Sequence, residues 1–204
     1  QGGMIYTNQW SIWLLVIISF GGLWLCIWQG KLRLLGLVPI LIAFLLISLT
    51  PRADILISDK ASLFAVRDSE GNLWFSEKRR ERFTRDKWQE SEGGKIHGFW
   101  DNKDSPVKCD ENICTYKYDD KLVSFIKDVS AIEQSCLNSD IIISRLKIDK
   151  KNCSSPKIII DRNDSLYNNA HIIYKDIFAN IKVKNIRDVR GSRPWMPFYR
   201  LEED

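Results

Sequence analysis

Cysteine is the residue type best able to do chemistry in this chain, and four of its five cysteines follow position 100. Cys109 and Cys114 flank the polar stretch DENI, while Cys136 and Cys153 flank the apolar run DIIISRLKI. Two cysteines across a short turn can reach bridging distance, so disulfides are expected. Four cysteines allow three pairings, of which we favour Cys109–Cys114 with Cys136–Cys153. A four-thiolate zinc site and four reduced thiols are the alternatives, although the spacing lacks the short knuckles of zinc sites.

Acid–base or metal chemistry has little support in the sequence. Neither His97 nor His171 has another histidine or an acid at metal-ligand spacing. Asp161 and Asp164 follow an apolar run and could bind a metal or act as bases, but such carboxylates more often start turns. The chain also lacks the phosphate-loop and nucleophile-elbow patterns. We therefore predict no catalytic residues, no cofactor and no enzymatic activity.

Two basic stretches could contact the phosphates of DNA or of lipid headgroups. One is KRRERFTRDK (78–87), with six basic residues, and the other is KVKNIRDVRGSR (182–193), with five. A solvated charged face is the simpler interpretation of either stretch alone, and the presence of two favours phosphate contact somewhat. The predicted phosphate contacts are Lys78, Arg79, Arg80, Arg82, Arg85, Lys182, Lys184 and Arg187.

The segment RGSRPWMPF (190–198) has the composition of a docking latch. Gly191 allows a sharp turn, Pro194 stiffens the segment and Trp195 supplies an apolar anchor beside Arg193. We expect it to pack onto the preceding domain.

The elements that must position these residues fall into two parts. Residues 1–50 contain no acid and only two basic residues, Lys31 and Arg33. Uncharged runs predict two membrane spans, at about 10–28 and 34–50, forming a hairpin over residues 1–51. Trp10 and Trp28 lie at the ends of the first run, where indoles favour a membrane interface.

The basic residues beside the two runs predict the orientation of this hairpin in the membrane. Lys31 and Arg33 in the connecting loop outnumber Arg52 beyond the second run, so the loop is expected in the cytoplasm and both termini outside. Disulfides in the remaining domain would agree with that orientation. The start at Gln1 indicates a fragment, a processed product or part of a longer reading frame.

Residues 52–204 predict one mixed α/β, or α+β, domain rich in strands. They hold 28 of the 30 basic residues and all 26 acidic residues, a balance that does not by itself indicate a nucleic-acid binder. The expected strands are 53–59, 62–68, a third strand after Gly71–Asn72, a hairpin around Asp119–Asp120, 140–146, 157–161, 170–175 and 180–188. Helices are expected over 82–91 and 130–138, the second with Ser130 as its N-cap and Glu133 as its partner.

The order of short motifs resembles the C-terminal end of ComEC-type competence proteins of the alphaproteobacterial branch. The motifs are LISLTPRADILIS, CDENIC, EQSCLNSDIIIS, IIIDRNDSLYNNAHIIY and DVRGSRPW. They extend over nearly all of this chain but over only about the last third of such a protein.

The resemblance implies an inner-membrane channel that moves single-stranded DNA into bacteria. It implies an outward-facing, non-enzymatic C-terminal domain, with the remaining channel helices, single-stranded DNA and membrane lipids as partners. Many family members end in a metallo-β-lactamase-like domain with a histidine-rich metal motif; that motif is absent here, which implies at most a degenerate version. A structural membrane module or relic of a split gene, and a degenerate metal-dependent nuclease, are the alternatives.

Overall fold

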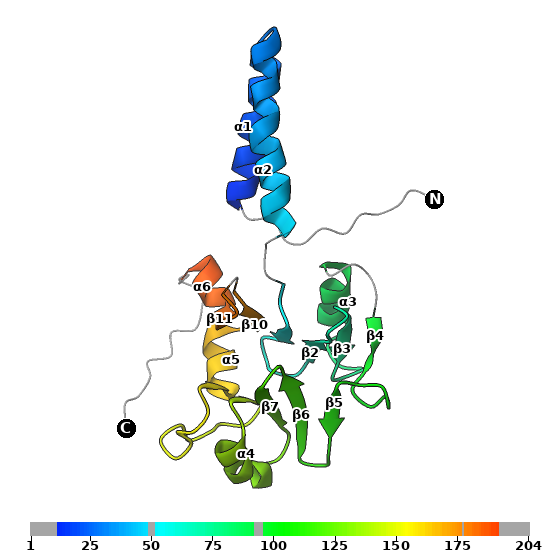
Figure 1. Ribbon diagram of the computed structural model, residues 1–204. Helices are drawn as coiled ribbons and strands as arrows, with labels where there is room; N and C mark the ends of the chain where they lie inside the picture. The colour runs from blue at the N-terminus through cyan, green and yellow to red at the C-terminus, as the bar shows by residue number, and fades with distance from the viewer. Residues whose placement is uncertain (1–11, 49–51, 92–95, 177, 192–204) are drawn as a thin grey trace.

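The computed structural model describes residues 12–48, 52–91, 96–176 and 178–191. Within these residues the chain forms a pair of helices, followed by two β-sheets with short helices beside them (Figure 1). The helical pair projects from one end of the sheets in that view.

The helical pair consists of α1 (Ile12–Ile27) and α2 (Leu37–Ser48), joined through a 3₁₀ turn over Lys31–Gly36. Two glycines bring the backbones close together. A Cβ atom at Gly21 would lie 2.8 Å from the carbonyl oxygen of Gly36, and a Cβ atom at Gly36 would lie 2.8 Å from that of Gly21. Most of the large apolar side chains of this pair are exposed.

Neither helix of this pair, nor any other in the described part of the chain, is both long and apolar enough to cross a membrane. The predicted spans at 10–28 and 34–50 are therefore wrong, and so is the multi-pass inner-membrane location. The helices have 16 and 12 residues, about 24 Å and 18 Å long against a hydrocarbon core of about 30 Å. The predicted second span included residues that are not part of the α-helix, because residues 34–36 belong to the 3₁₀ turn. The helix α2 begins at Leu37 and has Pro39 in its first turn, where a proline is tolerated.

The first sheet has six strands in the order β11-β10-β1-β2-β3-β4, mostly antiparallel, with β3 and β4 parallel. Its strands are short because Gly71 and other turn residues interrupt them closely. The strands are β1 (Ile55–Ile57), β2 (Phe64–Arg67), β3 (Leu73–Phe75), β4 (Ile96–Phe99), β10 (His171–Lys175) and β11 (Ile181–Asn185).

The second sheet has five strands in sequence order, with an antiparallel meander followed by parallel strands. The strands are β5 (Val107–Cys109), β6 (Ile113–Tyr118), β7 (Lys121–Ile126), β8 (Ile141–Ser144) and β9 (Ile158–Ile160). Because β7, β8 and β9 are parallel neighbours, their carboxyl ends lie at the same edge.

The two sheets share one core, because alternate side chains of each strand point to opposite faces. Val66 and Trp74 of the first sheet and Phe125 and Ile143 of the second belong to one buried cluster. The outer faces are covered by α3 (Arg82–Ser91) and by α4 (Ile132–Asn138), which follows a 3₁₀ turn at Val129–Ala131. Two further short helices are α5 (Arg162–Asn168) and α6 (Ile186–Arg190).

The described residues thus form an α+β arrangement of two sheets and six α-helices, which agrees with the α+β form of the expected domain, whereas the expected transmembrane hairpin is wrong. The helix predicted over 82–91 is α3, with the same bounds. The predicted cap at Ser130 is wrong, since the side chain of Asp128 accepts from the Ser130 N–H at 3.0 Å. The strand predicted over 180–188 ends at Asn185, whose side chain caps α6 in a capping box with Asp188.

Candidate functional site

A cleft of about 590 Å³ opens between the two sheets. This volume is typical of small-ligand sites. One wall comes from the first sheet and the loops after β3 and β4, and the other from β5, β6, β7 and the segment after β8. The lining residues include Phe64, Arg80, Trp100, Phe125, Lys127 and Arg145.

Three aromatic rings form the inner wall of the cleft. The ring centroids of Phe64 and Trp100 are 6.1 Å apart and nearly parallel, and Phe125 lies 4.7 Å from Trp100. The indole N–H of Trp100 donates to the carbonyl oxygen of Trp74 at 3.0 Å, so the ring orientation is fixed. Each of the three rings is at most 7% exposed. They therefore give the cleft a rigid apolar wall rather than a free stacking surface.

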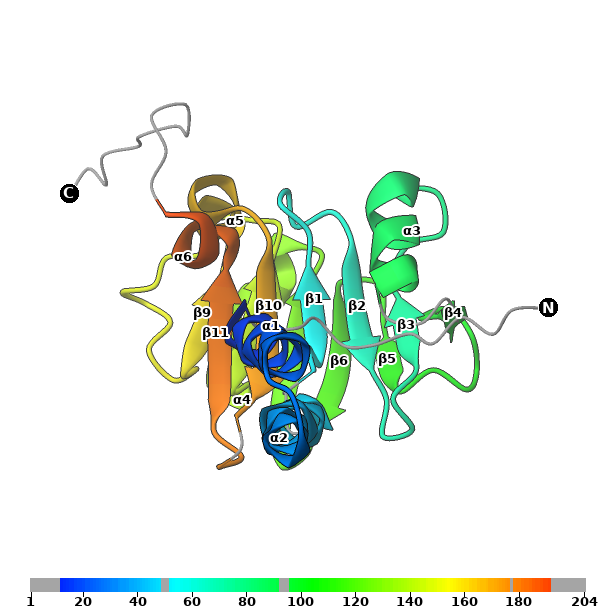
Figure 2. The same cartoon turned by 90° about the horizontal axis from the view of Figure 1, so that it is seen from above.

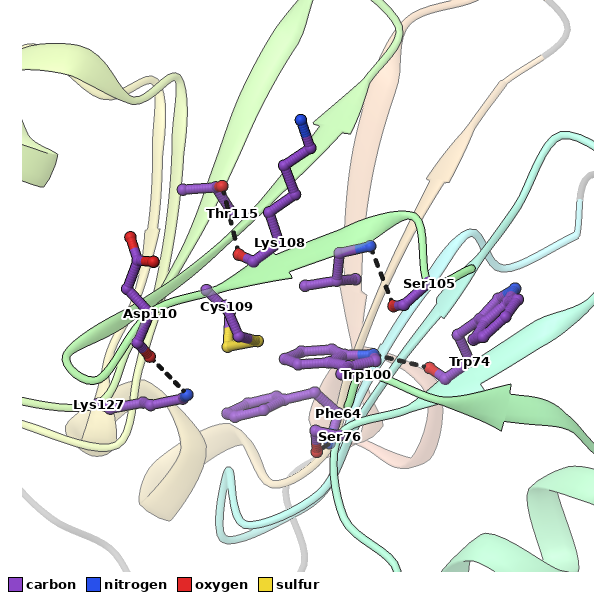
Figure 3. The surroundings of a disulfide bond; sticks show 12 residues. Phe64, Trp74, Ser76, Trp100, Ser105, Lys108, Cys109, Asp110, Thr115 and Lys127 are labelled. Carbon is purple, nitrogen blue, oxygen red and sulfur yellow. Dashed lines mark hydrogen bonds between the residues drawn. A yellow bond between two sulfur atoms is a disulfide. The ribbon is translucent and has the colours of Figure 1, made fainter. Parts of the chain in front are cut away.

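The Cys109–Cys114 disulfide lies beside this aromatic wall (Figure 3). Cys109 on β5 and Cys114 on β6 are directly opposite each other, with their Cα atoms 4.0 Å apart. The second disulfide joins Cys136 of α4 to Cys153. These two bonds are the pairing that the sequence favours, and they leave none of these thiols for zinc.

Three basic side chains also line the cleft, namely those of Arg80, Lys127 and Arg145. Lys127 is the first residue after β7, and Arg145 is the first after β8. The Lys127 ammonium donates to the carbonyl oxygen of Asp110 at 3.0 Å. Within the described segments, no hydrogen bond or ion pair engages the side chains of Arg80 and Arg145. Two acids also line the cleft, of which Asp101 is paired with Lys78 at 2.9 Å, while Glu77 has no ion pair within the part of the chain that the structure describes.

Of the predicted phosphate contacts in the first basic stretch, Arg80 alone lines this cleft. Lys78 is bound to Asp101 and stacks over the ring of Phe99 at 5.2 Å. Arg85 is half-buried and bonds both Asp86 and the carbonyl oxygen of Lys78, so it has a structural task. Arg79 and Arg82 are exposed and lie outside the cleft.

The second basic stretch lies at the far edge of the first sheet. Lys182 and Lys184 are on β11, and Arg187 is on α6. The strand order separates β11 from β3 by four strand spacings, about 19 Å. Figure 2 shows β11 and α6 at one side and α3 at the other. The two basic stretches are therefore not brought together.

The remaining predicted positions are described in part. Trp28 is 44% exposed and stacks on Trp24, with ring centroids 5.2 Å apart. Gly191 has φ +72° and caps α6, which agrees with its predicted turn. Trp10, Arg193, Pro194 and Trp195 lie outside the described residues.

Asp161 and His171 have side chains of types that often act in catalysis, but both are buried in the fold. Asp161 is 2% exposed and caps α5 by accepting from the N–H of Asp164 at 3.0 Å. His171 is 3% exposed, and burial lowers its pKa against the opposing effect of Asp164. Among the described residues, no three His, Cys, Asp or Glu side chains are grouped so that they could hold a metal ion.

A second large cavity, of about 530 Å³, is lined by groups that satisfy one another. The Arg67 guanidinium donates to the carbonyl oxygens of Ala53 and Gly71. The Tyr116 hydroxyl donates to the Arg67 carbonyl at 2.7 Å, and burial, with smaller effects of nearby acids, raises the Tyr116 pKa to about 12. Tyr118 donates to Asp54. This network links the two sheets and leaves few groups for a ligand.

Sequence reasoning missed Lys127 and Arg145 because each stands alone in its segment. A search for basic stretches finds neighbours in the chain, whereas these cations become neighbours through parallel strand pairing. The sequence feature that could have pointed to them is a basic residue directly after each apolar, β-branched run.

Comparisons with known proteins give no relative for this chain. No family model matches it, and neither the curated proteins nor the solved structures searched contain a match. The metallo-β-lactamase-like fold that the resemblance implied gains no support from them, and we do not propose it.

Proposed function

We propose that this chain is a non-enzymatic domain of a competence-type DNA-uptake system and that its cleft contacts the backbone of single-stranded DNA. The resemblance of its ordered motifs to ComEC-type proteins motivates the biological setting. The geometry of the cleft and of the sheet edge beside it motivates the part played by DNA.

The observation that carries the proposal is a row of cations at one edge of the second sheet. Lys127 and Arg145 directly follow the parallel strands β7 and β8, and Arg162 is the second residue after β9. Neighbouring strands are about 4.8 Å apart, so these cations recur along the edge at short intervals. A flexible phosphate chain can follow such a row, and phosphate neutralisation supplies most of the affinity of sequence-independent binding.

The size of the cleft favours a single strand. Its volume of about 590 Å³ fits individual nucleotides. The rigid wall of Phe64 and Trp100 gives the cleft an apolar lining that carries no hydrogen-bond code, which suits a protein that accepts any sequence.

Fluorescence anisotropy with a labelled single-stranded oligonucleotide, measured on the full chain at several salt concentrations, tests the proposal. R80Q/K127Q removes two cleft cations, and R79Q/R82Q removes two exposed cations of the same basic stretch as a matched control. We expect saturable binding by the wild type and a log–log salt slope smaller by about 1.4 in the cleft variant, at about 0.7 per lost single-strand contact. The control is expected to keep the wild-type slope.

Two results would overturn the proposal. The first is no saturable binding by the wild type even at low salt, which would leave a module without a nucleic-acid ligand. The second is equal weakening in both variants, which would reduce the binding to general attraction by net charge.

A further inference from the structure

A small cavity of about 290 Å³ adjoins the cleft through a shared residue, Arg145. It is lined by Lys60, Arg145, Arg162, Ser165 and Leu166, a set with three cations and no acid. Lys60 comes from the turn between β1 and β2, Arg145 follows β8, and Arg162 begins α5 after β9. The folding of three distant segments therefore places like charges around one small space.

The acids nearest in sequence are used elsewhere. The Asp161 carboxylate accepts from the N–H groups of Asp164 and Ile148 at 3.0 Å and 3.2 Å. The Asp164 carboxylate is paired with Lys150 at 2.8 Å. Asp59 precedes Lys60 but does not line the cavity. In the described segments, the side chains of Lys60, Arg145 and Arg162 have no hydrogen bond or ion pair.

A buried hydroxyl adds an independent observation. Ser165 lines the cavity and is 1% exposed, and its Oγ has no hydrogen-bond partner among the described residues. Buried polar groups are nearly always paired, and a bound oxyanion would give this hydroxyl the acceptor that it lacks. The cavity around Tyr116 and Arg67 differs, because its buried polar groups already have hydrogen-bond partners within the protein.

We infer that this cavity is a phosphate-binding pocket, in which Lys60, Arg145 and Arg162 neutralise the charge and Ser165 donates to one oxygen. Guanidinium groups match the oxygen geometry of phosphate, which makes two arginines and a lysine a suitable set. The ligand is a phosphate group, either free or at the end of a nucleic-acid strand. The pocket can be occupied whether or not the cleft binds DNA, so the inference goes beyond the proposed function.

Titration of the full-length ¹⁵N-labelled chain with inorganic phosphate, followed by the backbone amides of residues 145 and 162–166 and the Nε–H groups of Arg145 and Arg162, tests the inference. Chloride at equal ionic strength is the reference. We expect saturating shifts with a Kd of about 1–10 mM. K60Q/R162Q should weaken the Kd at least fivefold. K147Q/K157Q, which removes two exposed cations that do not line the pocket, should leave it unchanged.

Absence of saturation up to about 50 mM, well beyond the expected Kd, would overturn the inference. So would equal weakening in both variants. The S165A variant is a milder test, since it keeps the cations, and an unchanged Kd in that variant would contradict the assigned role of its hydroxyl.

Oligonucleotides with and without a 5′-phosphate distinguish the two sources of the ligand. Stronger binding of the phosphorylated strand, lost in K60Q/R162Q, identifies a strand end, whereas saturation by inorganic phosphate with no preference between strands identifies a free phosphate. The two proposals also fail separately. Phosphate binding without DNA binding ends the proposed function alone, and DNA binding that depends on Arg80 and Lys127 without phosphate saturation ends the pocket alone.

Discussion

The outer faces of the two sheets are covered in different ways. On the first sheet, the half-buried Trp88 of α3 packs against an apolar layer that includes Leu73 and Phe75. On the second sheet, the seven-residue α4 covers a layer around Ile142 and Ile148, and the Cys136–Cys153 disulfide is part of that layer. The first cover relies on one large side chain and the second on a covalent bond.

The difference has a physical origin in the covering segments. Isolated helices of this length are marginal in water and depend on tertiary packing. The ten residues of α3 include an indole that buries a large apolar area. The apolar contribution of α4 and its flanks comes from smaller residues such as Ala131 and Ile132. A disulfide that restricts the unfolded chain compensates for a weak apolar cover.

The largest effect is expected where the two sheets are alike, in their shared core. Phe125→Ala removes a ring that is 2% exposed and contacts both Phe64 and Trp100. We expect the free energy of unfolding to fall by about 3–5 kcal/mol, measured by urea denaturation. Phe83→Ala is the control, since Phe83 is 75% exposed, and it should change stability by less than about 0.5 kcal/mol. Similar losses in both variants would argue against one shared core.

The second effect tests the covalent cover. Replacing Cys136 and Cys153 together by alanine opens a loop with a sequence separation of 17 and should cost about 3 kcal/mol. Replacing Cys109 and Cys114, separated by 5, should cost about 2 kcal/mol on the same chain-entropy account. Urea unfolding of both double variants, under oxidising conditions, gives the comparison. A larger loss from the shorter loop would show that local packing, rather than loop closure, decides the effect.

The third effect tests the apolar cover. Trp88→Ala should lower the free energy of unfolding by about 2 kcal/mol, because the indole is half-buried against the buried layer that includes Leu73 and Phe75. Lys87→Ala is the matched control on the same helix, since its ion pair with Glu90 is exposed and contributes little to stability. A Trp88 variant as stable as the control would mean that α3 does not protect the first sheet.

The same contrast shows which features could be predicted from the sequence. The helix over 82–91 and the hairpin at Asp119–Asp120 were predictable because their signals are local, and Asp119 takes the positive φ that such a turn requires. The pairing of the cysteines that the sequence favoured is the one present, with sequence separations of 5 and 17. The length of α2 was not predictable from hydropathy, which does not register the 3₁₀ turn before Pro39.

The candidate site was harder to predict than the fold. Lys127, Arg145 and Arg162 come from single positions after separate strands, so no basic stretch contains two of them. Of the basic stretches that did stand out, Arg80 lines the cleft, whereas Lys78 is paired with Asp101 and Lys182 lies at the opposite edge of the first sheet. Parallel pairing of β7, β8 and β9 creates the site, and that pairing is non-local.

The smallest effect concerns pH and again separates the two sheets. His171 of β10 is buried in the first sheet, and the described strands of the second sheet contain no histidine. Burial is the main reason that its pKa is lowered, although Asp164 and Asp188 act in the opposite direction and Lys150 adds slightly to the lowering. Because the unfolded chain then binds the proton more strongly, the contribution of His171 to stability is present above pH 6.5, the unfolded value, and is lost as the pH falls below it.

We therefore expect the free energy of unfolding of the wild type to fall between pH 7 and pH 5, with part of that fall absent in His171→Gln. Urea denaturation at both pH values measures it, and the difference between the two proteins at each pH removes the contribution of the carboxylates. An equal fall in both proteins would mean that His171 is accommodated in its charged form, against the effect of its burial. Hydrogen exchange of the wild type at pH 5 locates the part of the fold that loses stability. We expect protection to fall first in β10 and in β1, its antiparallel neighbour, and only later in α4, the disulfide-bonded cover of the second sheet.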